Sequence, residues 1–230
     1  MEALTVEAPI APLAETAGPA LSPAPDAPAT LGDVLRRASD AVVPGQVVQV
    51  ARDGSETALG YDEVRDRAER ILGGVRVLGA MPGDEIVLQV ETIDEFAPAL
   101  WACILGGFTA VPAAVASGHP GSVQAARRLR DVWATLDHPL VLAGTGAASA
   151  VRSVLGAEAR VASVAELATG ARDRDGYEAA PDSVAVLLLS SGTTGRPKLI
   201  QRTHHNLLRV CQASLATQAA PTAFLGWLPL

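Results

Sequence analysis

The sequence contains few aromatics, few cysteines and almost no lysine. Its 230 residues include three Trp, two Tyr, three Phe, two Cys and a single Lys, against 43 Ala. With so few aromatic side chains, a packed core must rely on Leu, Val and Ile. The two cysteines, Cys103 and Cys211, lie in apolar stretches and form no Cys-x-x-Cys pair, so the sequence offers no zinc site. We expect both to be buried, reduced thiols of a cytoplasmic protein.

Long hydrophobic runs and an excess of positive charge are also absent. No apolar stretch reaches the roughly 18 residues that a membrane helix requires, and the N-terminus lacks the basic start and apolar segment of a signal peptide. The 18 basic and 25 acidic residues give a net charge of −7, so no nucleic-acid partner is expected. We therefore expect a globular protein of the cytoplasm without a membrane partner, long enough for one large domain or two small ones.

The first 29 residues differ in composition from the rest of the chain. Residues 1–29 contain six of the 16 prolines, many alanines and no Lys or Arg, which predicts a disordered Ala/Pro-rich leader. Ordered structure should begin at Thr30, where Thr30 and Asp33 have the spacing of a capping box for a short helix ending near Arg37. The folded part is therefore predicted to span 30–230.

The rest of the chain alternates strand and helix patterns. Apolar residues at spacings of three and four predict helices, and short β-rich runs bounded by turn residues predict strands. Asp53-Gly54 between two such runs predicts a hairpin turn. The predicted segments are a hairpin (46–51 and 56–59), strands at 85–90, around Ala110, at 140–143 and at 161–164, and helices at 62–78, 94–106, 122–136 and 147–155. This order predicts an α/β fold, a largely parallel sheet with flanking helices.

The helix predicted at 62–78 is amphipathic and should pack one face on a sheet. Its inward face is expected to carry six apolar residues: Val64, Ala68, Ile71, Leu72, Val75 and Leu78. Four charged residues are expected to point to solvent: Arg65, Arg67, Glu69 and Arg76.

An uninterrupted apolar run at 184–189 is followed by the polar loop Ser190-Ser191-Gly192-Thr193-Thr194-Gly195-Arg196-Pro197-Lys198. The run has the length and composition of a buried central strand with helices on both faces. In the loop, glycines let backbone N–H groups approach an anion, hydroxyls add donors, and Lys198, the only lysine of the chain, adds a positive charge. The loop therefore predicts a phosphate-binding site, with an ordinary surface turn as the alternative. It is not a Walker-type loop, because Arg196 and Pro197 separate Gly195 from Lys198.

These residues resemble the signature [Thr/Ser]-Ser-Gly-[Ser/Thr]-Thr-Gly-x-Pro-Lys-Gly of the adenylate-forming superfamily, which includes acyl-CoA synthetases, aryl-acid ligases and nonribosomal peptide adenylation domains. Eight of its nine specified positions match, and Leu199 replaces the last glycine. The resemblance extends through 61–64, 82–84, 101–107 and 226–230, and covers about residues 30–230. The segments 129–133 and 139–142 look most like loading ligase domains of polyketide and hybrid peptide synthases.

The resemblance implies the N-terminal part of the large domain of an adenylate-forming enzyme, truncated at its C-terminal end. Such an enzyme joins a carboxylic acid to ATP with Mg²⁺, releases pyrophosphate, and passes the acyl group from the acyl-adenylate to a thiol. The thiol belongs to coenzyme A or to the phosphopantetheine of an acyl or peptidyl carrier protein, in polyketide or nonribosomal peptide (antibiotic) biosynthesis. The family pattern places six residues of this sequence against the ATP phosphates: Ser191, Gly192, Thr193, Thr194, Gly195 and Lys198.

The same resemblance places the remaining machinery beyond Leu230. The catalytic residues, most of the acid pocket and the C-terminal lysine of the family are expected there, so the 230 residues alone should be inactive. The carboxylic acid that is activated therefore stays unidentified.

Two other functions remain open. The turn Gly144-x-Gly146-x-x-Ser149 follows a predicted strand, and Glu166 lies about where a ribose-binding acid would, which permits a nicotinamide-dinucleotide site. Against it, Ser149 stands in place of the third small Gly or Ala. The second alternative is a non-catalytic docking or scaffold segment of a synthase.

Two further groups of residues have structural interpretations. His204 and His205 are adjacent, point about 100° apart on a helix, and have no acidic or Cys partner at ligand spacing, so Thr203 followed by this pair predicts a helix start rather than a metal site. The run Arg127-Arg128-Arg130 predicts a solvated helix face, with carrier-protein docking as the alternative.

Overall fold

A computed structural model gives the structure of this chain. It describes residues 25–43, 45–51, 53–115, 122–190 and 198–216. Residues 1–24, most of the predicted leader, lie outside the described residues, so the prediction of disorder there stays a prediction. None of the helices in the described residues combines the length and the apolar composition of a membrane-spanning segment.

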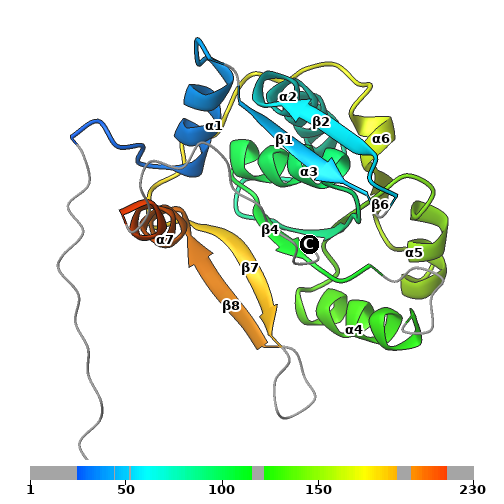
Figure 1. The fold of residues 1–230 in the computed structure, drawn as a ribbon. Coiled ribbons are helices and arrows are strands. Elements are labelled where there is room, and N and C mark those ends of the chain that lie inside the picture. Colours follow the sequence, from blue (N-terminus) through cyan, green and yellow to red (C-terminus); the bar gives the residue numbers. More distant parts are fainter. Residues whose placement is uncertain (1–24, 44, 52, 116–121, 191–197, 217–230) are drawn as a thin grey trace, which may run out of the picture.

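The centre of the fold is a six-stranded sheet (Figure 1). All neighbouring strands pair in parallel except the last two, which are antiparallel. In spatial order the strands are β6 (Val161–Ser163), β5 (Leu140–Ala143), β3 (Glu85–Gln89), β4 (Thr109–Pro112), β7 (Val184–Ser190) and β8 (Lys198–Thr203). The predicted α/β fold with a largely parallel sheet and flanking helices is confirmed.

Helices cover both faces of this sheet because its strands are apolar on both sides. One core cluster joins the sheet to α1, α2, α3 and α6, and the other joins it to α4 and α5. The helices are α1 (Leu31–Ser39), α2 (Tyr61–Val77), α3 (Ile93–Gly106), α4 (Ser122–Thr135), α5 (Ala148–Leu155), α6 (Val164–Leu167) and α7 (His204–Ala216). The four-residue helix α6 was not predicted, since it is too short to show a period.

Local sequence signals are confirmed near the start of the described chain. Thr30 caps α1, and its capping box with Asp33 is complete in both directions. The predicted hairpin forms from β1 (Gln46–Val50) and β2 (Glu56–Gly60), paired antiparallel. Its turn contains Gly54 at a φ of +83°, a conformation that favours glycine.

Glu69, Leu78 and Cys211 depart from the burial that the sequence predicts. Glu69 was expected at the surface but is 4% exposed, because residues of the segment between α6 and β7 cover it. Leu78 was expected in the core but is 43% exposed, because it follows the last helical residue of α2 and no longer obeys the helical period. Cys211 lies exposed on α7, whereas Cys103 is buried as predicted.

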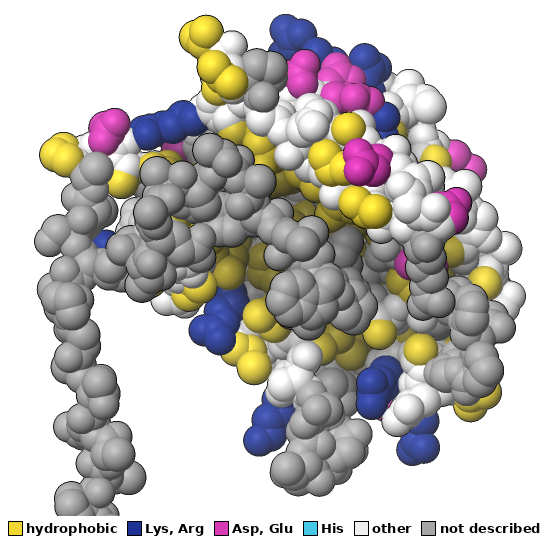
Figure 2. Space-filling model, in the orientation of Figure 1, with side chains coloured by type: hydrophobic (Ala, Val, Ile, Leu, Met, Phe, Trp, Pro, Cys, Tyr) yellow, Lys and Arg dark blue, Asp and Glu magenta, His cyan; other side chains and the backbone are white. Residues whose placement is uncertain are grey.

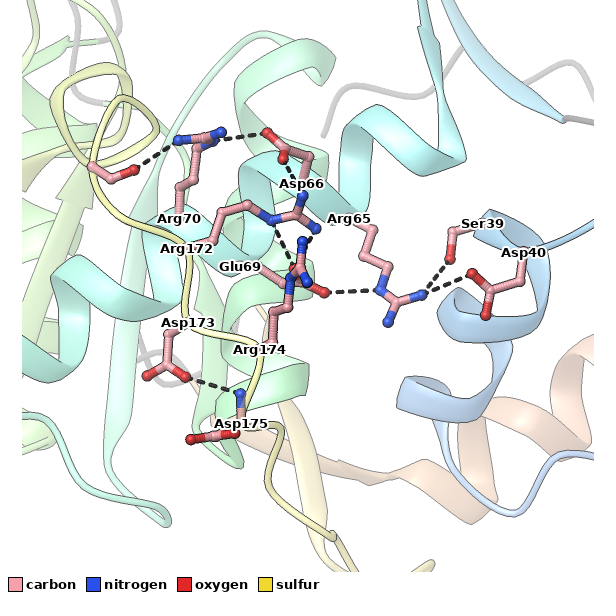
Figure 3. A network of polar contacts seen from close by, with 11 residues as sticks. Ser39, Asp40, Arg65, Asp66, Glu69, Arg70, Arg172, Asp173, Arg174 and Asp175 are labelled. Carbon is pink, nitrogen blue, oxygen red and sulfur yellow. Dashed lines mark hydrogen bonds and ion pairs between the residues drawn. The ribbon is translucent and has the colours of Figure 1, made fainter.

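Glu69 is the centre of a network of ion pairs (Figure 3). Its carboxylate accepts from Arg65 Nε at 2.8 Å and from Arg172 Nη2 at 2.6 Å. Arg172 also contacts Asp66 at 2.8 Å, and Arg76 pairs with Asp173 at 2.6 Å. Hydrogen bonds from Arg70, together with the nearby positive charge of Arg172, lower the pKa of Asp66. The network therefore ties the segment that leads into β7 to helix α2.

Candidate functional site

Strand β7 carries the polar loop at its carboxyl end. It pairs in parallel with β4 through Ala110 and Val186, and Ala185, Val186 and Leu187 are buried. The prediction of a buried strand is confirmed over this first half. It is wrong for Leu188, which is 40% exposed. Its cross-strand partner Ile200 lies on the edge strand β8 and is itself 38% exposed, and neither residue belongs to a core cluster of the described residues.

Strand β8 returns antiparallel along β7 and was not predicted. The register places Ser190 opposite Lys198 and Leu188 opposite Ile200. Cross-strand partners in an antiparallel pair have Cα atoms about 4.5–5.5 Å apart. The two ends of the polar loop are therefore fixed next to each other at the edge of the sheet, while residues 191–197 lie outside the described residues. That excluded part contains five of the six predicted phosphate-binding residues: Ser191, Gly192, Thr193, Thr194 and Gly195.

Lys198 is the one predicted phosphate-binding residue that the structure describes. It is the first residue of β8, its side chain is exposed, and no ion pair of the described residues involves it. Because no carboxylate in this part of the chain neutralises it, its ammonium group is available to an anion at the end of β7.

The carboxyl edge of the parallel strands also holds a cavity of about 500 Å³. Residues that follow β3 and β5 line it, among them Thr92, Glu95 and Thr145. Open α/β sheets bind ligands at the carboxyl ends of their strands, beside the point where the strand order reverses and the chain continues on the other side of a central strand. Here β3 lies between β4 and β5, so the cavity and the end of β7 share the edge at which the fold places ligands.

The contacts of the glycine turn 144–146, which follows β5 and lines this cavity, bear on the nicotinamide alternative. Thr145 donates its backbone N–H to Glu95 Oε2 at 3.0 Å, and its hydroxyl also donates to the Glu95 carboxylate. A Cβ added at Gly144 would lie 2.9 Å from Glu95 Oε2. A carboxylate thus occupies the place where a dinucleotide would put its pyrophosphate, and the two negative charges would repel each other. Glu166, the predicted ribose ligand, is exposed on α6.

Sequence reasoning missed the role of Glu95. It lies in the first turn of α3, 50 residues before the turn that it holds, and no local pattern links the two positions. The contact favours a structural role for Gly144 and Gly146 over a nicotinamide site.

His204 has a structural place, as predicted. Helix α7 begins at this residue, and the side chain is 3% exposed. Its Nδ1 accepts the backbone N–H of Leu31 at 3.2 Å, which joins the start of α1 to the end of β8. Burial lowers the pKa of His204, while the charge of Asp33 opposes that shift. Among the described residues, no group of three His, Cys, Asp or Glu side chains could hold a metal ion.

Cys103 lies in the core, where burial raises the pKa of its thiol to about 12. A thiol with this pKa is uncharged at neutral pH and cannot act as a nucleophile.

Comparisons with known proteins bear on this arrangement. The family described as "AMP-binding enzyme" matches residues 36–230. The chain is 33% identical over 199 residues to the salicyl-AMP ligase / salicyl-S-ArCP synthetase of Mycobacterium tuberculosis, over 81% of this chain and 34% of that protein. Residues 36–230 contain every element from β1 to α7, so the match includes both strands that flank the polar loop.

Solved structures give the same relationship. The adenylation domain of a keto acid-selecting NRPS module, bound to a keto acyl adenylate, has a TM-score of 0.74 and 28% identity, over 84% of this chain and 36% of that one. The McyG A-PCP structure with phenylalanyl-adenylate has a TM-score of 0.72 and 31% identity, over 82% and 30%. The chain therefore spans about a third of the length of these relatives.

Proposed function

The chain belongs to the AMP-binding enzyme family of adenylate-forming ligases, and we propose that it supplies the ATP-phosphate-binding part of a carboxylic acid ligase. The polar loop at 190–198 supports this proposal most strongly. Its nine residues combine four hydroxyls, two glycines and two cations, and its ends are paired across β7 and β8. The two described ends of the loop, Ser190 and Lys198, therefore lie opposite each other at the edge of the sheet.

The chemistry explains why the loop has this composition. A carboxylate that attacks the α-phosphorus of ATP is a weak nucleophile and meets the negative charge of the triphosphate. Donors and positive charge on the β- and γ-phosphates withdraw that charge and stabilise pyrophosphate as it leaves. We assign this role to Ser191, Gly192, Thr193, Thr194, Gly195 and Lys198. ATP enters as its Mg²⁺ complex, which is part of the substrate.

The acyl-adenylate then passes to a thiol, and we propose a carrier-protein phosphopantetheine or coenzyme A as the acceptor. Two relatives support the carrier protein: a salicyl-S-ArCP synthetase and the A-PCP protein McyG. Biosynthesis of a polyketide or nonribosomal peptide is the matching setting, as in the hybrid PKS-NRPS synthetase prlS, which is 28% identical over 162 residues. Because this chain spans about a third of its relatives, we propose that the reaction requires further parts of a longer protein.

Acid-dependent exchange of labelled pyrophosphate into ATP tests the proposal in the protein that carries this chain. Lys198→Ala and Thr194→Val should each slow exchange by roughly one to two orders of magnitude, if one charge-assisted phosphate contact is worth about 1.5–3 kcal/mol. Arg196→Ala is the control, because that position varies in the family signature, and it should keep its rate within a few-fold. Unchanged exchange in both test variants contradicts the assignment of the loop.

The alternative, a non-catalytic docking or scaffold segment, makes a different prediction in the same assay. A scaffold would support no acid-dependent exchange with any of a panel of aryl, alkyl and amino acids, and would not bind ATP. The 230 residues alone should bind ATP weakly and release no pyrophosphate in response to an acid, because the groups that orient the carboxylate are proposed to lie elsewhere.

A further inference from the structure

The arginines of this protein are distributed unequally between the two faces of the sheet. On the face covered by α1 and α2, and on the segment between α6 and β7, seven arginines each have a carboxylate oxygen within 4.0 Å. They are Arg36, Arg65, Arg67, Arg70, Arg76, Arg172 and Arg174. On the other face, α4, α5 and the turn after α5 carry five exposed arginines. They are Arg127, Arg128, Arg130, Arg152 and Arg160.

None of these five arginines forms an ion pair with any residue that the structure describes. Residues 122–160 contain five arginines and three carboxylates and so carry a charge of +2, in a chain whose total is −7. In Figure 2, Lys and Arg side chains lie over α4 and the nearby end of β8, whereas the Lys and Arg side chains around α2 lie beside Asp and Glu side chains. The α4–α5 face is therefore a basic surface on an acidic protein.

Two of these guanidinium groups are held in place without being neutralised. Arg130 Nε donates to the carbonyl oxygen of Val154 at 2.9 Å, and Arg152 Nη2 donates to that of Val161 at 2.6 Å. A carbonyl group fixes the orientation of an arginine but leaves its charge in place. Side chains that are ordered before binding lose less entropy when a partner arrives.

Helix α4 also exposes an apolar residue next to these arginines. Leu129, Val132 and Trp133 face the core, so the opposite stripe of the helix faces solvent. That stripe places Val123, 82% exposed, at helical spacing from Arg127 and Arg130. An exposed aliphatic residue beside several arginines has the composition of a protein interface, where arginine is enriched and lysine depleted.

We propose that the basic surface formed by Arg127, Arg128, Arg130, Arg152 and Arg160 docks a protein partner with an acidic face. The residues outside 122–160 carry a net charge of −9, and this charge indicates what kind of partner can bind. A compact acidic patch meets only the basic surface, whereas a long polyanion such as a nucleic acid would also meet the acidic remainder and be repelled. This inference is independent of the function proposed for the loop between β7 and β8.

Fluorescence anisotropy with a labelled Glu-rich helical peptide tests the docking surface on the full chain. The peptide should bind, and its affinity should fall as salt is added. Arg127→Ala/Arg128→Ala should weaken binding about five- to tenfold, since two arginine–carboxylate contacts are lost. Arg127→Lys/Arg128→Lys should retain most of the affinity, because the charge remains.

The matched control is Arg67→Ala/Arg70→Ala, which removes the same charge from two half-buried, ion-paired arginines of α2. This variant should bind the peptide within about twofold of the unmodified chain. A matched peptide with Gln in place of Glu should not bind. Equal losses in both double variants, absence of peptide binding, or tighter binding of a short DNA duplex than of the peptide would each overturn the proposal.

Discussion

The buried ion-pair network gives the sharpest prediction about stability. Replacing Glu69 by Ala removes the carboxylate that accepts from both Arg65 and Arg172. The Glu69 side chain is 5% exposed, while those of Arg65 and Arg172 are 28% and 32% exposed. The variant therefore removes the most buried acceptor of two partly buried guanidinium groups, which keep Asp40 and Asp66, and loosens the segment that leads into β7.

The size of the effect follows from this burial. Breaking a fully buried pair costs about 3–5 kcal/mol, and an exposed pair contributes about 0.2–1 kcal/mol. Because water can rehydrate arginines that are about a third exposed, we expect the free energy of unfolding to fall by about 2–3 kcal/mol. For a chain of this length, this corresponds to a melting temperature lower by roughly 4–12 °C.

Urea denaturation followed by circular dichroism measures the loss, and Glu63→Ala provides the control. Glu63 lies on the same helix and pairs with Arg67, but the two side chains are 49% and 36% exposed, so the control should lose at most about 1 kcal/mol. Both changes replace Glu by Ala, which removes any difference in helix propensity. In a double-mutant cycle, Glu69 and Arg172 should couple by at least about 1 kcal/mol. Equal losses for the two Glu→Ala variants would refute the reasoning.

Three further predictions concern His204, the two cysteines and the N-terminal residues. The pKa of His204 is lower in the folded chain than in the unfolded chain, so the free energy of unfolding should decrease as the pH falls below 6.5. His204→Gln should make this decrease shallower in urea denaturation measured at a series of pH values, and identical slopes for the two proteins would show that His204 is not responsible. Iodoacetamide at neutral pH should alkylate the exposed Cys211 and leave Cys103, whose thiol pKa is about 12, unmodified until denaturant is added. Mass spectrometry of the peptides measures this, and alkylation of Cys103 before Cys211 would contradict the prediction. A chain beginning at Pro28 should melt at the same temperature as the full chain, since the deletion removes one exposed hydrogen bond, from Arg37 to the carbonyl of Asp26, from the described structure; a drop of several degrees would mean that the N-terminal residues pack on the fold.

The elements that could be predicted are those encoded by neighbouring residues. The capping box of Thr30 and Asp33 and the Asp53-Gly54 turn act within a few residues, so their signals survive in the sequence alone. The alternation of strands and helices likewise predicted the α/β class. The start of α7 at His204 was predicted for the same reason.

The misses depend on contacts between distant parts of the chain. The helical period places Glu69 on the outer face of α2, and it is buried because Arg172, 103 residues later in the sequence, packs against it. Strand β8 has a weak alternation of its own, and its pairing depends on the unpaired edge of β7. The Glu95 contact with Thr145 depends on the order β5-β3-β4, which the sequence alone did not provide.

Isotope transfer from the acid to AMP tests most directly whether the polar loop serves adenylation of a carboxylic acid. The protein that carries this chain is incubated with ATP, Mg²⁺, a thiol acceptor and an acid labelled with ¹⁸O in its carboxylate, and the nucleotide product is analysed by mass spectrometry. If the carboxylate attacks the α-phosphorus, one ¹⁸O atom becomes the bridge between the acyl carbon and the phosphorus. The thiol then attacks the acyl carbon and breaks the bond between that carbon and the bridging oxygen, so AMP should carry one ¹⁸O atom. Unlabelled AMP, or ¹⁸O in inorganic phosphate together with ADP, would contradict the claim.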